Sequence, residues 1–301
     1  MIVFEEIIAR RVNIPLRQVK NTVELLEEGA TIPFISRYRK EHTGSLDEVK
    51  ITEIRDELNS LKELQKRKEY ILKTIKEQDK LSAELEKKIE ECLDPVVLED
   101  IYLPYKPKRK TRAAVARERG LEPLAKILLK QQEMQVEKAA AGFVKEDIED
   151  VEMALQGARD IIAEWVNENA RARRTVRYHF ERDAVISSKL VKGKEEEAVK
   201  FKDYFEFSEP LKRCPGHRIL AMRRGEAEGF LKISVEPTAG KVTDALDEQF
   251  VKSPYDVGQQ VAEAVKDAYK RLMQPSIENE FKALFKEKAD REAITVFALS
   301  L

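Results

Sequence analysis

Apolar residues recur at steps of three and four positions through the two longest helical patterns of this chain. The first pattern spans residues 47–78 and contains Ile51, Ile54, Leu58, Leu61, Leu64, Ile71, Leu72 and Ile75. The second spans residues 150–171 and contains Val151, Ala154, Leu155, Ala158, Ile161, Ile162, Trp165 and Val166. Such spacing predicts amphipathic α-helices whose apolar stripe is buried. The first helix would be roughly 48 Å long, and we expect it to brace several smaller helices.

Two shorter helical patterns precede the first long one. Residues 4–11 form one, and Pro15 starts a second that ends at Gly29. Such a pair resembles a helix-turn-helix, which reads DNA with exposed side chains of its second helix. The residues of that helix that suit DNA are Arg17, Lys20 and Asn21, and those that would repel phosphate are Glu24, Glu27 and Glu28. DNA reading and a structural hairpin are therefore both open.

Capping residues predict where three further helices begin. Ser82, Asp94 followed by Pro95, and Thr111 are each placed to cap a helix, and the helix after Thr111 should end at Gly120. Between Tyr102 and Pro107, two prolines three positions apart predict an extended, polyproline-like crossing.

One stretch has the alternating pattern of β-strands. Residues 218–224 and 230–236 alternate around a glycine-bounded turn, which predicts a β-hairpin at about 217–236. A lone hairpin is only marginally stable in water, so it should pack on helices or on a further domain. Helical patterns return at 242–251, at 257–273 and from residue 277 to the end.

These patterns predict a mainly α fold. We expect an elongated multi-helical assembly with long bracing helices, an N-terminal helix-turn-helix-like hairpin and one small β-hairpin. We divide it into a helical domain of residues 1–190 and a helical segment of residues 191–301 that carries the hairpin.

Composition narrows the class of partner. The chain has 55 Lys and Arg against 56 Asp and Glu, so a uniformly basic coat for nucleic acid is excluded. Any binding face must come from local segregation of charge. Two isolated cysteines, no signal peptide and no apolar run of about 20 residues predict a reduced, cytoplasmic protein without a membrane partner.

No catalytic constellation stands out. His42, His179 and His217 are far apart in sequence, and neither G-x-x-x-x-G-K nor G-x-G-x-x-G occurs. We therefore predict a protein that is not an enzyme and that holds no metal and no cofactor.

Two clusters of cations need an explanation in a chain of nearly zero net charge. The candidate nucleic-acid-binding residues are Tyr105, Lys106, Lys108, Arg109, Lys110, Arg112, Arg171, Arg173, Arg174, Arg177 and Tyr178. Cations interleaved with aromatic residues suit a phosphate backbone and unstacked bases. The alternative is that these cations pair with acids of the same chain and complement a helix terminus. If nucleic acid binds, both clusters should lie on one surface.

A third basic stretch, residues 37–40, raises the same question. Tyr38 can stack on a base between Arg37 and Arg39. The favoured alternative is that both arginines pair with Glu28, Glu41 or Asp47.

Three long motifs stand out along the chain. The first is DIYLPYKPKRKTRAAVARERGLEPLA at residues 100–125. The second is EGATIPFISRYRKE at residues 28–41, followed by Thr43 and Gly44. The third is GHRILAMRRG at residues 216–225, followed by Glu228 and Gly229. All three resemble motifs of the bacterial Tex family of transcription accessory proteins, an RNA-binding family, and the resemblance covers essentially the whole chain.

This resemblance implies a non-enzymatic, nucleic-acid-associated module of a transcription accessory protein. Family members continue into an RNase H-like domain, helix-hairpin-helix units and an OB-fold RNA-binding module, so we expect this chain to be an N-terminal fragment. DNA or RNA would then be held mainly by the missing domains, with the transcription machinery as a further partner. The same resemblance implies that related eukaryotic elongation factors share this core. The alternative function is a helical scaffold that positions those later domains and docks a protein partner.

Overall fold

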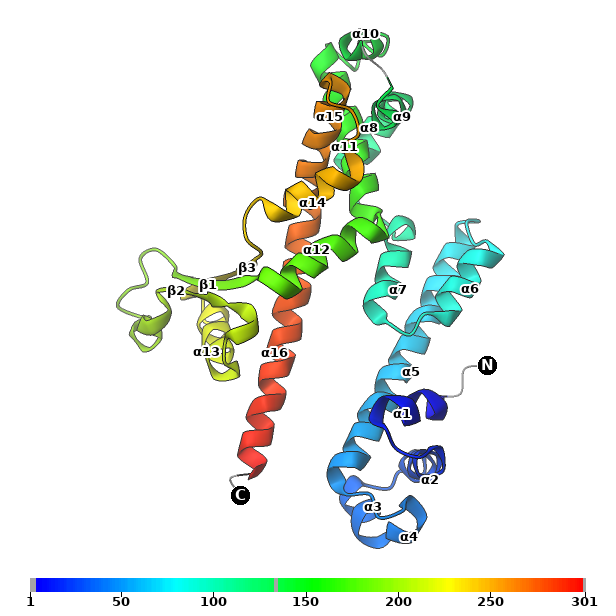
Figure 1. Cartoon of the computed structure of the whole chain (residues 1–301), viewed down its shortest axis with the longest axis vertical. Coiled ribbons are helices and arrows are strands. Elements are labelled where there is room, and N and C mark those ends of the chain that lie inside the picture. Colours follow the sequence, from blue (N-terminus) through cyan, green and yellow to red (C-terminus); the bar gives the residue numbers. More distant parts are fainter. Residues whose placement is uncertain (1–3, 133–134, 300–301) are drawn as a thin grey trace. The chain divides into compact units, whose positions relative to one another are not determined.

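The computed structural model describes residues 4–132 and 135–299 and confirms a mainly α fold (Figure 1). The chain forms two compact units, Met1–Lys106 (unit 1) and Pro107–Leu301 (unit 2). The domain boundary expected near residue 190 stays a prediction.

Unit 1 is built on one long helix, α5 (Glu48–Glu77), which matches the predicted brace. Its other helices are α1 (Phe4–Val12), α2 (Leu16–Glu27), α3 (Ile32–Tyr38), α4 (Lys40–Thr43), α6 (Ala83–Glu91) and α7 (Pro95–Tyr102). The Asp47 carboxylate caps α5 by accepting a hydrogen bond from the Lys50 amide at 2.8 Å. Leu58 and Leu61 are only 4% and 2% exposed, so the apolar stripe is buried as predicted.

The core of unit 1 follows α5 from end to end. Near its first half, α1 and α2 contribute Ile8, Val19 and Val23 to one apolar cluster. Near its second half, α6 and α7 contribute Ile89, Leu98 and Tyr102 to another. The predicted caps Ser82 and Asp94 both accept hydrogen bonds from first-turn amides of their helices. Each small helix thus buries its apolar face against the same rod.

The predicted extended crossing after α7 is wrong for its first half. Leu103–Tyr105 form a short 3-10 helix, and the backbone becomes extended only at Lys106. Pro104 is tolerated because an amide at a helix start has no acceptor within the helix to lose. The Gln78 side-chain amide donates to the Tyr105 carbonyl at 2.8 Å and fixes this turn.

Unit 2 surrounds α11 (Val151–Glu168), the second predicted long helix. Helices α8 (Arg112–Glu118), α9 (Glu122–Lys130), α10 (Val136–Ala141) and α15 (Asp256–Asp267) pack around it. Trp165 is half-buried against this core, as the apolar stripe predicted. The helix ends earlier than predicted because the Asn169 side chain caps a new helix, α12 (Ala170–Asp183), by accepting from the Ala172 amide at 3.0 Å.

The remaining helices of unit 2 are α13 (Gly216–Ala227), α14 (Lys241–Phe250) and α16 (Gln274–Leu299). Of these, α14 and α16 follow the predicted helical pattern, whereas α13 does not. A π-helical segment, Ala268–Met273, joins α15 to α16 without a break. Short 3-10 turns occupy Val199–Tyr204 and Leu211–Arg213.

The predicted β-hairpin is wrong. Residues 218–224 lie in α13, and the sheet has three antiparallel strands in the order β2 (Glu206–Pro210), β1 (Val185–Leu190), β3 (Leu231–Glu236). Ile219 and Met222, both buried, are spaced by one helical turn as well as being part of an alternating run. Pro215 before Gly216 is a good helix start. Of the two predicted strands, only the second is confirmed, as β3.

The free edge of β3 is covered by α16. Glu278 of that helix accepts a hydrogen bond from the Val235 amide at 2.9 Å, and Lys282 donates to the Ile233 carbonyl at 2.7 Å. These two side chains, one turn apart, also pair with each other at 3.0 Å. An exposed edge strand invites pairing with another chain, so this cover protects the sheet.

The buried stripe of α5 makes a direct prediction for stability. Replacing Leu58 with Ala should lower the free energy of unfolding by about 2–5 kcal/mol, because it leaves a cavity between α5 and its neighbours. Urea unfolding followed by circular dichroism measures this. Val49, 64% exposed on the same helix, is the control; Val49→Ala should change stability by less than about 0.5 kcal/mol. Equal effects of the two changes would contradict the brace.

Candidate nucleic-acid interface

The first basic cluster is divided between anchored and exposed cations. The Lys108 ammonium pairs with Glu168 and lies 3.3 Å from the Glu164 carboxylate. Arg117 donates to the same Glu164 carboxylate at 2.7 Å. Thr111, which caps α8 as predicted, also bonds to Glu164 at 3.3 Å. These contacts tie the segment 107–111 to the C-terminal end of α11.

The two carboxyl groups of this anchor have pKa values that shift in opposite directions. Burial favours the neutral form of Glu164, but the hydrogen bond from Arg117 and the charge of Lys108 outweigh it and lower the pKa of that carboxyl. For Glu168, burial dominates and raises the pKa of the carboxyl despite the hydrogen bond from Lys108. Of the two carboxyl groups, Glu164 therefore holds its negative charge more strongly.

The other cations of this cluster face water. Lys110 pairs with Glu118 at 3.5 Å, and both side chains are largely exposed. Arg109 and Arg112 are exposed and form no ion pair within the described residues. Tyr105 and Lys106 end unit 1: Tyr105 packs against the cluster under α6 and α7, and Lys106 is exposed.

The second basic cluster lies on α12 and is also divided between anchored and exposed cations, because its residues lie on different faces of that helix. Arg173 and Arg177 point to α16, where the Arg177 guanidinium grips both oxygens of Glu280 at 2.8 and 3.1 Å. Arg173 lies 3.3 Å from Glu280 and also donates to Asn167 and Ser276. These two arginines bind α12 to α16 and are largely removed from water.

The opposite face of α12 presents Arg171, Arg174 and Tyr178. All three are exposed, and they recur at steps of three and four residues, so they share one face. Arg182, one turn further, lies over the Tyr178 ring at 5.4 Å and donates to its hydroxyl at 3.0 Å. Arg171 and Arg174 form no ion pair within the described part of the chain.

Lys108 of the first cluster reaches the junction between α11 and α12. Glu168, which holds Lys108, is the last residue of α11, and Arg171 lies three residues later in the first turn of α12. The segment 107–111 is therefore anchored beside the start of the exposed α12 face.

In unit 1, the favoured pairing of Arg37 and Arg39 with acids is wrong. Neither arginine forms an ion pair with Glu28, Glu41 or Asp47 among the described residues. Instead, the Arg39 guanidinium lies over the Phe34 ring at 5.2 Å. The sequence analysis missed this arrangement; the spacing of Phe34 and Tyr38 at i and i+4 is the signal that could have indicated a pair of neighbouring rings.

The helix-turn-helix-like residues have mixed surroundings. Arg17 and Lys20 are exposed on α2, whereas the Asn21 side chain donates to the His42 carbonyl at 2.7 Å. Asn21 thus connects α2 to α4.

Groups that could support other functions are sparse in the part of the chain that the structure describes. Across residues 4–132 and 135–299, no three His, Cys, Asp or Glu side chains are placed to hold a metal ion. Over the same residues, no helix combines the length and apolar character needed to cross a membrane.

Family models match most of the chain. A model described as Tex-like protein N-terminal domain matches residues 3–76, and one described as Tex central region-like matches residues 131–297. The chain belongs to the Tex family. The second match alone covers more than half of the sequence, and it contains the whole of α11, α12 and the sheet.

Curated relatives agree with this assignment. The Tex chain is 42% identical to the transcriptional accessory protein Tex of Neisseria gonorrhoeae, over 94% of this chain and 38% of that protein. It is 38% identical to the protein tex of Bordetella pertussis, over the same shares. It is 27% identical to the human S1 RNA-binding domain-containing protein 1, over 98% of this chain and 31% of that protein. The chain thus spans about two fifths of the length of its bacterial relatives.

The anchor at Glu164 predicts a pH-dependent loss of stability. Replacing Glu164 with Gln should lower the free energy of unfolding by about 1–3 kcal/mol near neutral pH, because Lys108 and Arg117 lose their shared charged acceptor. The pKa of Glu164 is lower in the folded state than its ordinary value of 4.5, so its contribution is present above that value and lost as pH falls. The gap between wild type and variant should therefore narrow below about pH 4.5.

Urea unfolding at a series of pH values checks this. Glu118→Gln is the matched control, since Glu118 also pairs with a cation of the cluster but is 65% exposed. It should have an effect below about 1 kcal/mol at every pH. A Glu164→Gln effect that is small, or that does not change with pH, would contradict the anchor.

Proposed function

We propose that this chain is a non-enzymatic, nucleic-acid-associated module of a transcription accessory protein, and that it contacts nucleic acid through exposed cations of unit 2. The proposal rests on one observation: in each of the two clusters, some cations pair with acids and others are exposed. Arg109, Lys110 and Arg112 come from the first cluster, and Arg171 and Arg174 from the second; all five are exposed.

Electrostatics explains why a local patch is needed. A chain whose acids and bases cancel cannot attract a polyanion through its average charge. Several arginines and lysines without strong acid partners, gathered at one junction, can neutralise successive phosphates and release their counterions. Tyr178 lies on the same face of α12 and offers an aromatic ring to an unstacked base.

The names of the relatives support the same class of function. The Neisseria protein is named a transcriptional accessory protein, and the human protein is named for an RNA-binding domain. Because this chain spans only part of those proteins, nucleic acid would be held jointly with their remaining segments.

A scaffold function is the second candidate, and a specific observation favours it. Lys108, Arg173 and Arg177 form ion pairs with acids of the same unit. These three cations therefore stabilise the fold and are not free to bind phosphate. In this alternative, the chain positions other domains and docks a protein partner.

A charge-reversal pair separates the two candidates. Arg171→Glu with Arg174→Glu should weaken binding of oligonucleotides of unrelated sequence to a similar extent, because phosphate contacts do not read sequence. Loss of two contacts should reduce the slope of log affinity against log salt by about 1.4 on single strands and about 1.8 on duplex. Fluorescence anisotropy titrations at several salt concentrations measure both quantities.

The control reverses the same number of charges elsewhere on unit 2. Lys130 and Lys138 are exposed on α9 and α10 and form no ion pair within the described residues. Lys130→Glu with Lys138→Glu should leave the affinity and its salt dependence nearly unchanged. If the two double variants bind alike, with folding intact by circular dichroism, the scaffold alternative is preferred.

A further inference from the structure

Unit 1 carries an exposed aromatic ladder outside the basic surface of unit 2. The rings of Phe34 and Tyr38 lie 5.4 Å apart between centroids on one face of α3. Arg39 covers the Phe34 ring at 5.2 Å. Tyr38 is 69% exposed and Phe34 is 40% exposed, although large aromatic side chains normally contribute to a core.

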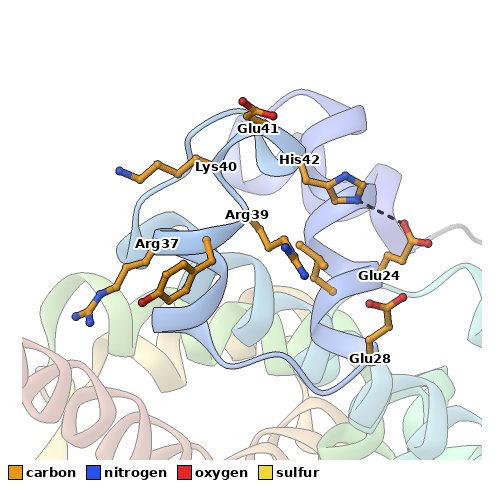
Figure 2. Close-up of a pocket in the computed structure, with 9 residues that line it drawn as sticks. Glu24, Glu28, Arg37, Arg39, Lys40, Glu41 and His42 are labelled. Atoms are coloured by element: carbon orange, nitrogen blue, oxygen red, sulfur yellow. Dashed lines mark ion pairs between the residues drawn. The ribbon is translucent and has the colours of Figure 1, made fainter.

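The ladder borders an open groove between α2 and the segment that contains α3 and α4. The groove has a volume of ≈ 780 Å³, within the range of about 300–1,000 Å³ of small-ligand sites. Figure 2 shows Arg37 and Lys40 pointing away from α2, while Arg39 extends toward the helix that carries Glu24 and Glu28. None of the three cations forms an ion pair among the described residues, so their charges are available to a ligand.

Contacts behind the ladder hold the groove in shape without a ligand. Thr43 is fully buried, and its hydroxyl donates to the Arg39 carbonyl at 3.1 Å. Gly44 ends α4 in the left-handed region with φ +69°, where a Cβ would meet the Gln18 side chain of α2 at 2.2 Å. The bond from Asn21 to the His42 carbonyl completes this attachment. A preorganised surface binds with a smaller loss of conformational entropy.

We propose that this groove binds single-stranded nucleic acid by stacking a base on Tyr38, with Arg37 and Lys40 meeting the flanking phosphates. An aromatic face can be reached only by a base that has left its helix, which selects single strands over duplex. The site is separate from the cations of unit 2 and does not depend on their role.

Charge balance defines what kind of site this is. Arg37, Arg39 and Lys40 line the same groove as three carboxylates, those of Glu24, Glu28 and Glu41. Net attraction for a polyanion is therefore small, and stacking must supply most of the affinity. Apart from the phosphate contacts of Arg37 and Lys40, the contribution of this site should therefore not depend on salt.

The test uses the full 301-residue chain with fluorescent single-stranded oligo(U) and a duplex of equal length. Tyr38→Ala should weaken single-strand binding by about 5- to 150-fold, the range that removal of one base stack produces. The salt slope should stay unchanged, because no phosphate contact is lost. Duplex binding should not change. Tyr38→Phe keeps the ring and should retain the affinity of the wild type.

Matched variants separate this inference from the function proposed above. Tyr255 is 58% exposed in unit 2 and serves as the aromatic control; Tyr255→Ala should bind as wild type. Combining Tyr38→Ala with the double reversal at Arg171 and Arg174 should add the two losses, since the residues belong to different units. If only the reversal weakens binding, the unit 2 surface stands and the Tyr38 site falls.

Three outcomes overturn the proposal. They are unchanged single-strand affinity of Tyr38→Ala, an equal loss for duplex and single strand, and an equal loss for Tyr38→Phe. Because Tyr38 is mostly exposed, the variant should fold; a thermal melt that matches wild type verifies this. The proposal would also be rejected if the groove bound a basic or acidic peptide but no oligonucleotide.

Discussion

Two carboxylates decide which cations of unit 2 are structural and which face water. The buried Glu164 binds Lys108, Arg117 and Thr111, and the half-buried Glu280 binds Arg173 and Arg177. A buried anion must be compensated, so Glu164 requires its partners. Cations one position away in the same clusters have no such acid and remain exposed. The basic clusters are thus two populations, and only one of them is free to meet a phosphate.

The two proposals give this chain two different ways to contact nucleic acid. On unit 2, exposed arginines and lysines would act through charge and would lose affinity as salt rises. On unit 1, Phe34, Tyr38 and Arg39 form a stacked ladder whose surroundings are nearly neutral. We infer that the first contact would follow the backbone of any strand, whereas the second would require an unpaired base.

The sequence predicted well those features that depend on neighbours along the chain. The stripe of α5 and the caps at Ser82, Asp94 and Thr111 are local, and the structure confirms them. Long-range pairing was beyond it: Ser188 of β1 lies opposite Phe207 and Ile233, and the alternation of these short strands is weak. The false strand at 218–224 arose because a short apolar run fits either a strand or a helix, and the buried residues Ile219 and Met222 have the three-residue spacing of a helix. The predicted ion pairs of unit 1 were wrong for a similar reason. Arg37 and Glu28 are close in sequence, but they do not form an ion pair in the structure.

The exposure of individual arginines is the central claim, and chemical footprinting tests it most directly. Arginines of the free chain and of its complex with an oligonucleotide would be modified with a dicarbonyl reagent and quantified by mass spectrometry. We predict that Arg109, Arg171 and Arg174 react in the free chain and are protected in the complex. Arg173 and Arg177 should react slowly in both. Equal reactivity of Arg171 and Arg173, or no protection of the exposed set by saturating nucleic acid, would contradict the account.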